Sequence, residues 1–344
     1  MSQYSELAVS SSPEISLRRA RELALAAPQP RYWLHGLLLM ATCFTTLIVG
    51  AQLQLNFLRN QPAFSLDESL FPVMSMMRHP AQLILGIPFA ATLMLILLAH
   101  ELGHYITARR HDVQASLPYF IPAPTLIGTL GAFIRIRSRI PSRRALFDIG
   151  VAGPIAGFAL AVPALIWGTM LSRWEPNLAR ASDLQLGYPQ LFRLLAPLAQ
   201  HGAIRATFSV VDIYLHPVAI AAWVGLFATA LNLLPGGQLD GGHLVYALWP
   251  GAHKWISRGL VVALLAMSPF LWPGWLLWAG MLLSFGRRHP YVPEAEKLGP
   301  MRAALAALAL FIFLLSFTPA PFPGTALQPA QVKQGAVKLL HFFR

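Results

Sequence analysis

Long runs of apolar residues limit what this chain can fold into. The second run is the clearest, because residues 81–99 contain no charged side chain. A helix needs about 20 such residues to cross a bilayer, and inside the bilayer its backbone groups must bond to one another. Comparable runs cover residues 32–53, 145–171, 208–234, 259–285 and 303–318. We therefore expect a multi-spanning helical membrane protein.

The composition agrees with a membrane location. Hydrophobic residues make up 56% of the chain and charged residues only 12%, whereas a soluble domain has about 25% charged residues. The net charge of +12 does not indicate nucleic acid, because the basic residues lie between the apolar runs, where membrane proteins keep their cytoplasmic anchors. We therefore expect the lipid bilayer, and no nucleic acid, as a partner.

Residues 259–285 leave the number of spans open. Pro269, Pro273 and Gly274 interrupt this run, so it forms either one long helix or two short helices packed as a hairpin. The predicted fold class is an all-α polytopic membrane protein with about six or seven transmembrane helices. The expected regions are a cytoplasmic N-terminal tail (1–31), a membrane domain (32–318, core 82–250) and a C-terminal tail (319–344).

The basic residues predict the orientation. With a cytoplasmic N-terminus and a hairpin over residues 259–285, one side of the membrane collects most of the 26 Lys and Arg residues. The positive-inside rule assigns that side to the cytoplasm. We predict a multi-pass protein of the cell membrane, in which residues 100–104 and Asp240 lie near the cytoplasmic face. The segments on that side are 1–31, 109–144, 254–258 and 287–302.

His100, Glu101 and His104 directly follow the uncharged run. Histidines four residues apart lie on one helix face and can bind one metal ion. Zinc accepts such a pair with a third ligand and leaves a fourth position for water, whose pKa falls to about 7. Glu101 is placed to take a proton from that water. The alternative is a polar helix end at the membrane surface, although ionisable groups at this depth are costly unless a metal or a partner compensates.

The third ligand must come from another part of the chain. Cys43 is the only cysteine and lies in an apolar run, so a metal site must use histidine and carboxylate ligands. Asp240 lies where Pro235, Gly236 and Gly237 break the fourth helix. Irregular backbone at membrane depth is tolerated where it lines a cavity. Because Asp-Gly is also common in turns, a surface turn is the alternative.

Together, these motifs resemble the site-2 protease family of intramembrane zinc metalloproteases. With residues 118–124 and 128–133, they most resemble the branch that includes chloroplast and bacterial members, and the resemblance covers roughly residues 82–290. The segments that carry it are His100-Glu101-Leu102-Gly103-His104, Asn232-Leu233-Leu234-Pro235, Leu239-Asp240-Gly241 and residues 147–157.

The resemblance implies one zinc ion (Zn2+) held by His100, His104 and Asp240, with Glu101 as the catalytic base. It implies transmembrane protein substrates that are hydrolysed within or near the bilayer. It also suggests that Asn232 stabilises the oxyanion formed during peptide hydrolysis, because a side-chain amide can donate a hydrogen bond there. The alternative role of Asn232 is to hold the helix break by hydrogen bonding.

A short strand is predicted between the second and third helices, within a membrane-associated β-hairpin. Residues 131–137 alternate, with Ile134 and Ile136 on one face and Arg135 on the other. A helical substrate must be unwound before cleavage, and an edge strand can bind an extended peptide through its backbone. We therefore predict substrate binding by Ile134, Arg135 and Ile136. A purely structural hairpin between the helices is the alternative.

Four residues near the motifs receive structural interpretations. Asp148, near the start of the third helix, is expected to favour the helix dipole. Gly153 and Gly157 have the small-xxx-small spacing that lets helices approach closely. His243, three residues after Asp240, is expected near the metal without binding it, or in a loop.

Two other functions would use the same residues. A zinc or ion transporter would use the ligands as a transit site, although Glu101 lies where a hydrolytic base belongs and no inverted repeat is obvious. A catalytically silent zinc-binding protein would be expected to lack a ligand or the base, and none is lost here. The loop over residues 172–205 is too short for an independent domain. Substrate choice is therefore expected to depend on the membrane core, short loops or a regulatory membrane partner.

Overall fold

Helices dominate the structure, a computed structural model. It describes residues 31–64, 76, 78–196, 212–285, 289–293 and 298–325. Two small antiparallel sheets of two strands each accompany the helices. The mostly helical class predicted from the sequence is confirmed. Nearly all of the predicted N-terminal tail and most of the C-terminal tail lie outside the described residues.

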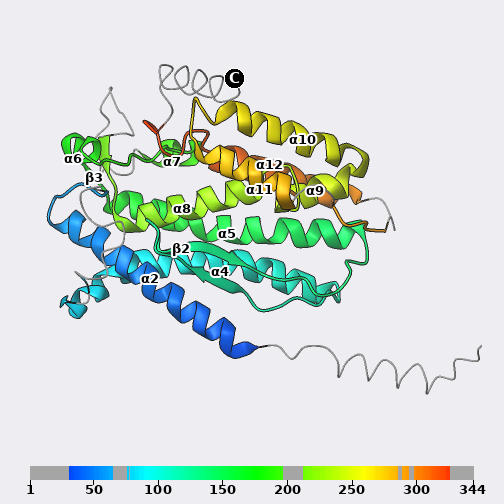
Figure 1. Cartoon of the computed structure of the whole chain (residues 1–344), viewed down its shortest axis with the longest axis horizontal. Coiled ribbons are helices and arrows are strands. Elements are labelled where there is room, and N and C mark those ends of the chain that lie inside the picture. The colour runs from blue at the N-terminus through cyan, green and yellow to red at the C-terminus, as the bar shows by residue number, and fades with distance from the viewer. Residues whose placement is uncertain are drawn as a thin grey trace, which may run out of the picture.

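Three helices form the centre of the molecule (Figure 1). They are α4 (Ile87–Arg110), α5 (Arg143–Leu171) and α8 (Pro217–Asn232), and each packs against the other two. α8 is buried along almost its whole length, because small and aliphatic side chains let the neighbouring backbones approach it closely. This packing buries the ionisable residues of segment 100–104 in α4 and leaves Asn232, the last residue of α8, half-buried.

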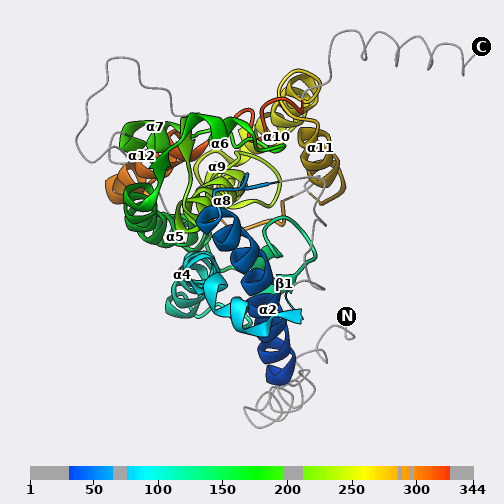
Figure 2. The same cartoon turned by 90° about the vertical axis from the view of Figure 1, so that its left-hand side faces the viewer.

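The other long helices surround this centre. α2 (Tyr32–Leu58) packs against α4 and against the 3-10 helix η1 (Pro80–Gly86) that leads into α4. α12 (Gly299–Ser316) packs against α5 and α8. Figures 1 and 2 show α2 and α10 (Pro250–Met267) at opposite edges of the molecule.

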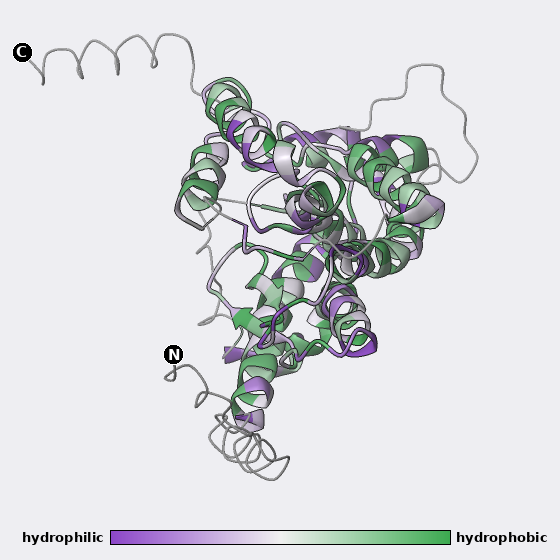
Figure 3. Ribbon diagram, turned by 90° about the vertical axis from the view of Figure 1, so that its right-hand side faces the viewer, coloured by the Kyte–Doolittle hydropathy of each residue, from purple (hydrophilic) through white to green (hydrophobic). Residues whose placement is uncertain are grey.

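Within the residues that the structure describes, four helices are long and apolar enough to cross a membrane. Figure 3 shows hydrophobic residues along most of the helices. Pro217–Asn232 and Gly274–Ser284 are shorter apolar helices. The count of six or seven spans therefore stays a prediction. The four candidate spans are Tyr32–Leu58, Pro80–Arg110, Arg143–Leu171 and Gly299–Ser316.

The fourth apolar run differs from its prediction. The sequence predicts a helix over residues 208–234, but α8 begins only at Pro217, after strand β4 (Ile213–Tyr214). His216 ends the extended segment, because its Nδ1 accepts a hydrogen bond from the Val218 N–H at 3.2 Å and caps the helix. Proline at the first helical position also favours a start here. Since other helices enclose α8, it does not need the length of a lipid-facing span.

Residues 259–285 form two helices rather than one. α10 and α11 (Gly274–Phe285) pack against each other on either side of a break. The Trp275 indole N–H donates to the Pro319 carbonyl oxygen at 2.8 Å and anchors the start of α11. The prolines and glycine that interrupt the sequence here therefore mark a helix boundary.

A two-stranded sheet lies between α4 and α5 in the chain. β1 (Tyr119–Pro122) pairs antiparallel with β2 (Thr129–Phe133). The sheet is attached to α2, since the Thr45 hydroxyl donates to the Gly128 carbonyl oxygen at 2.6 Å. Because α2 is a candidate span, this contact places the sheet beside a helix of membrane type.

The strand predicted over residues 131–137 is displaced in the structure. β2 ends at Phe133, so Ile134 and the residues after it lie outside the regular strand. The partner segment explains the end, because Pro118 precedes β1 and has no N–H to continue the ladder. The sequence pattern around Ile134 contains no information about this partner.

The chain nevertheless stays extended beyond β2. The backbone groups of Arg135 and Arg137 bond to residues 114–116, at N···O distances of 2.7–2.9 Å. Ile134 and Ile136 are half-buried, whereas Arg135 and Arg137 are exposed. The predicted alternation is therefore present, although the regular ladder is not.

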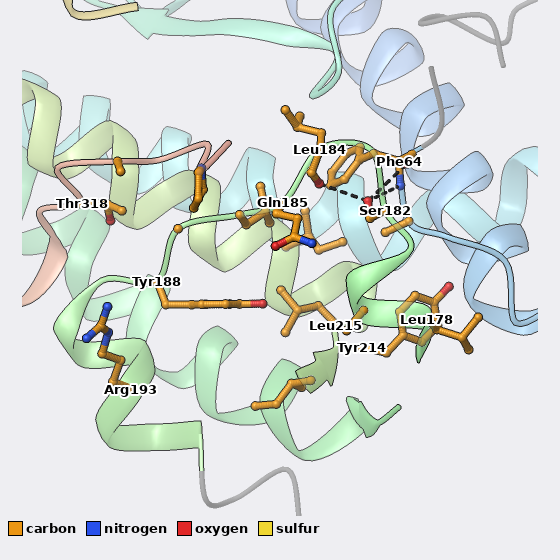
Figure 4. A pocket seen from close by; sticks show the side chains of 18 of the residues that line it. Phe64, Leu178, Ser182, Leu184, Gln185, Tyr188, Arg193, Tyr214, Leu215 and Thr318 are labelled. Atoms are coloured by element: carbon orange, nitrogen blue, oxygen red, sulfur yellow. Dashed lines mark hydrogen bonds between the residues drawn. The ribbon is translucent and has the colours of Figure 1, made fainter. Parts of the chain in front are cut away.

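Several short elements lie around the N-terminal end of α8. They are β3 (Arg173–Trp174), which pairs with β4, and the helices α6 (Pro176–Arg180) and α7 (Gln190–Leu195). The described part of the C-terminal tail folds onto them, and the Gly187 N–H donates to the Pro321 carbonyl oxygen at 2.8 Å. A pocket of about 380 Å³ lies in this region (Figure 4).

Candidate active site

α4 places two histidines and a glutamate inside the helical bundle. His100 and His104 lie about one turn apart, and Glu101 is next to His100. Each of the three keeps only 5–6% of its surface exposed. Ionisable side chains this deeply buried need partners or a metal.

The carboxylate comes from the start of a short helix, α9 (Asp240–Leu248). The chain leaves α8 after Asn232 and folds back before Asp240 begins α9. Gly241 and Gly242 permit this close approach, because a side chain at either position would overlap backbone atoms of residues 233–237. The glycines after Asp240 therefore hold it against the bundle rather than forming a surface turn.

Three side-chain atoms form a triangle between α4 and α9. The Nε2 atoms of His100 and His104 are 3.1 Å apart. Asp240 Oδ2 lies 3.3 Å from the first and 3.2 Å from the second. In a tetrahedral zinc site with bonds of about 2.0 Å, neighbouring ligand atoms are about 3.3 Å apart. The triangle therefore fits three corners of a zinc tetrahedron.

The burial of Asp240 agrees with a metal ligand. Its Oδ2 atom is buried and has no hydrogen-bond partner. Buried polar atoms are normally satisfied, so this oxygen calls for a missing partner. Among the described residues, His100, His104 and Asp240 are the group whose ligand atoms lie close enough for one ion.

α5 fixes the orientation of His104. His104 Nδ1 lies 2.7 Å from the Ile149 carbonyl oxygen. A carbonyl only accepts, so Nδ1 carries the proton and Nε2 keeps its lone pair for a metal. Gly153, one turn further along α5, faces the same ring, and a side chain there would overlap His104 Nε2.

The sequence motifs do not predict these two contributions from α5. Ile149 acts through its backbone carbonyl, which has no signature in the sequence. Gly153 carries a visible signal, its spacing from Gly157, but this spacing was interpreted only as helix packing. The structure adds contact with a ligand side chain to that interpretation.

Asn232 and Glu101 complete the cluster. Asn232 is the last residue of α8, and its Nδ2 lies 3.1 Å from His100 Nε2. Glu101 is outside the ligand triangle, and the backbone N–H of Ile134 faces its carboxylate. The side chains named by the two sequence motifs are therefore brought together at one place.

Comparison with known proteins identifies the family. The model of peptidase family M50 matches residues 88–270, which is more than half of the chain. The chain belongs to peptidase family M50. The resemblance to site-2 proteases, predicted from the motifs, is thereby confirmed.

Several plant proteins are similar to this M50 chain. It is 36% identical to the probable zinc metalloprotease EGY1, chloroplastic, of Arabidopsis thaliana, over 68% of this chain and 43% of that protein. It is 31% identical to EGY2 of the same plant, over 78% of this chain and 47% of that protein. It is 35% identical to EGY1 of Oryza sativa subsp. japonica, over 68% and 41%. The chain spans less than half the length of these relatives, and no solved structure matches it.

The M50 site lines a small pocket of about 220 Å³. Ile134 and Ile136 contribute to its wall, as does His243. Arg135 does not line it, and its side chain is exposed. Of the three residues predicted to bind substrate, the structure therefore brings the two isoleucines to the site and directs Arg135 elsewhere.

The pocket in Figure 4 offers different chemistry. It lies at the other end of α8 and is lined mainly by apolar residues, with polar groups that include Gln185, Tyr188 and Arg193. None of its described lining residues is a histidine or a carboxylate. Its described lining residues therefore include no group like the His100, His104 and Asp240 cluster.

Proposed function

We propose that this chain is an intramembrane zinc metalloendopeptidase that hydrolyses peptide bonds of membrane-anchored proteins, within or near the bilayer. The observation that carries the proposal is the triangle of His100, His104 and Asp240, with sides of 3.1–3.3 Å, beside the buried Glu101. Membership of family M50 supports it, as do relatives named probable zinc metalloproteases.

In the proposed mechanism, the triangle holds one zinc ion. When bound there, zinc supplies the positive charge that lowers the pKa of water and polarises the substrate carbonyl. The Glu101 carboxylate takes the proton of the attacking water and then gives it to the leaving amine. Asn232 Nδ2 donates a hydrogen bond to the oxygen on which negative charge develops. Its position, 3.1 Å from His100 Nε2, supports this role over one confined to the helix break.

Substrate binding is assigned to the backbone edge around Ile134 and Ile136. Arg135 directs its backbone N–H and C=O toward residues 114–116. In an extended chain, the backbone groups of neighbouring residues point in opposite directions, so those of Ile134 and Ile136 face the other side. The contact between Ile134 N–H and Glu101 supports this direction. An unwound substrate would pair with this edge, while Arg135 holds the segment at the lipid headgroups.

The proposed location is the cell membrane, with a cytoplasmic N-terminus and the active site near the cytoplasmic face. Arg109 and Arg110 in the last turn of α4 support this orientation, as do Arg143 and Arg144 at the start of α5. The proposed partners are a transmembrane protein substrate, the bilayer and a regulatory membrane partner. The relatives are named chloroplastic, so the membrane itself needs a direct test.

The proposal is tested with purified protein in detergent. A library of labelled single-span peptides is incubated with the zinc-loaded protein, and the products are identified by mass spectrometry. We expect discrete cleavage that a chelator stops and added zinc restores. A transporter would instead move zinc into proteoliposomes and cleave no peptide. Zinc flux without cleavage would therefore replace the peptidase with a transporter.

A further inference from the structure

His243 lies at the zinc pocket without belonging to the ligand triangle. It follows Asp240 by about one turn of α9 and lines the 220 Å³ pocket. Its ring nitrogens are not part of the group that could hold a single ion. Gly150 of α5 leaves room for it, because a Cβ at position 150 would be 3.2 Å from the His243 Cβ.

A second histidine determines which ring nitrogen of His243 carries the proton. His243 Nδ1 lies 2.8 Å from His289 Nε2, and His289 Nδ1 lies 2.7 Å from the Pro290 carbonyl oxygen. The carbonyl can only accept, so His289 Nδ1 donates to it and His289 Nε2 is an acceptor. His243 Nδ1 must then be the donor of the pair. His243 Nε2 is left as an unprotonated acceptor.

This assignment requires neutral rings, which their surroundings favour. Burial lowers the pKa of His243 to about 4, and the neighbouring His289 acts in the same direction, while the Asp240 carboxylate opposes them. Burial also lowers the pKa of His289. The Tyr246 ring stacks on His289, with ring centroids 3.9 Å apart, and keeps it in place.

His243 lines the pocket, and its free nitrogen is not fully buried. Within the described part of the chain, His243 Nε2 makes no hydrogen bond, yet it is not among the fully buried unpartnered atoms. His104 has the same design, in which an anchored Nδ1 leaves Nε2 facing the site. The proposed partner of His104 Nε2 is a metal ion. For His243 it must be a hydrogen-bond donor.

We propose that His243 Nε2 accepts a hydrogen bond from a backbone N–H of the bound substrate, and that His289 is the positioning residue that keeps it an acceptor. The inference rests on the proposed peptidase function. An unwound substrate exposes N–H groups that have lost their helical partners, and such groups are costly when buried unpaired. Glu101 and Asp240 are committed to proton transfer and to the metal, and the edge at Ile134 and Ile136 can pair with only one side of an extended peptide. The N–H groups on the other side of the peptide therefore need a further acceptor.

The test measures binding in the Glu101→Gln protein, which makes it independent of turnover. The probes are a fluorescein-labelled single-span peptide and its ester analogues, in which one backbone N–H at a time is replaced by oxygen through the middle of the span. At one position we expect the ester to bind about 3- to 10-fold more weakly than the amide. His243→Phe should abolish this difference. Esters at positions that pair with the Ile134–Ile136 edge should lose binding equally in both proteins. The proposal is overturned if every ester that weakens binding does so equally with and without His243.

His289 provides a matched pair of variants. His289→Gln keeps an acceptor oxygen for His243 Nδ1, whereas His289→Leu removes it. We expect the ester effect to persist with glutamine and to disappear with leucine, while zinc content and thermal stability report on the fold. Identical behaviour of the two variants would refute the positioning role. Failure of the wild-type protein to cleave any peptide would refute the peptidase instead, since the ester comparison relies on binding alone.

Discussion

Unlike His100 and His104 on the same helix, Glu101 contributes no atom to the ligand triangle. It can therefore be changed without removing a metal ligand. Its burial and its contact with the Ile134 N–H place it at the edge of the same pocket. The proposed proton transfer and the proposed metal binding should therefore be separable by mutation at single residues.

Glu101→Gln is expected to abolish cleavage while zinc stays bound. Glutamine keeps the shape of the side chain but cannot take a proton, which should cost about 10²- to 10⁴-fold in rate. Zinc content by elemental analysis and peptide cleavage are measured on the same preparation. His104→Gln is the control that should lose both. Full activity of Glu101→Gln would contradict the mechanism.

Gly153→Ala is expected to weaken zinc binding about 10- to 100-fold, the range found for residues that orient metal ligands. The added methyl group would overlap His104 Nε2 and push the ring out of the triangle. Gly157→Ala is the control, because its Cβ would lie 3.2 Å from the His100 Cβ and needs only a small shift. Metal titration distinguishes the two variants. Zinc affinity of Gly153→Ala equal to that of the unchanged protein would show that Gly153 serves helix packing alone.

At the scale of elements, a helix that follows from a local sequence pattern can be predicted, whereas a strand that depends on a distant partner cannot. The apolar runs around α4 and α5 are predictable, because a lipid-facing helix needs a long uncharged segment. The start of α8 is not, since strand β4 depends on pairing with β3, about 40 residues earlier. The strand predicted over residues 131–137 is displaced for the same reason, because its end depends on the partner strand β1. The spacing of His100 and His104 predicts the two proposed histidine ligands, whereas the His243–His289 contact joins residues 46 positions apart.

Ile136→Pro tests the proposed binding edge. It removes the N–H that faces away from residues 114–116, and it leaves the contact between Ile134 N–H and Glu101 in place. We expect KM for a single-span peptide to rise about 3- to 10-fold, the effect of one lost hydrogen bond. Zinc content should be unchanged. A variant that folds, binds zinc and cleaves with wild-type KM would leave the segment a structural hairpin.

Asp148 connects elements in a way its sequence position did not predict. It lies beyond the first turn of α5, so the expected dipole role is wrong. Instead, its carboxylate accepts two hydrogen bonds from Arg302 of α12, at 2.7 and 2.8 Å, and lies 3.0 Å from His111 Nε2 at the end of α4. A bidentate pair of this kind is among the stronger polar contacts.

Asp148→Asn should therefore loosen α12 from the bundle. In a double-mutant cycle with Arg302→Gln, we expect a coupling of about 0.5–3 kcal/mol in the free energy of unfolding. Thermal or denaturant unfolding in detergent provides the measurement. Glu175→Gln, at an exposed position, is the control and should change little. Additive effects of the Asp148 and Arg302 substitutions would mean that the pair does not hold the helices together.

At the scale of the whole molecule, the long central helix gives the protein two distinct ends. α5 has 29 residues, so its ends are about 44 Å apart, more than the thickness of the hydrocarbon layer. The ligand triangle lies near the end where α5 begins, because Ile149 contacts His104. The pocket of Figure 4 lies near the end where α8 begins. For the proposed peptidase, the orientation in the membrane would therefore decide which compartment receives the cleaved segment.

Cysteine labelling at the two ends of α5 tests the proposed orientation. Arg139 and Asn177 flank this helix and are exposed, which makes them suitable labelling positions. Ser182, on the same side as Asn177, is a poorer choice because its hydroxyl is hydrogen-bonded to the backbone of Phe64. In a Cys43→Ser background, an impermeant reagent should label Asn177→Cys in intact cells. It should label Arg139→Cys only after the cells are opened, because the positive-inside rule keeps the basic segment around Arg139 in the cytoplasm. Labelling of Arg139→Cys alone in intact cells would reverse the topology and place the zinc site at the outer face.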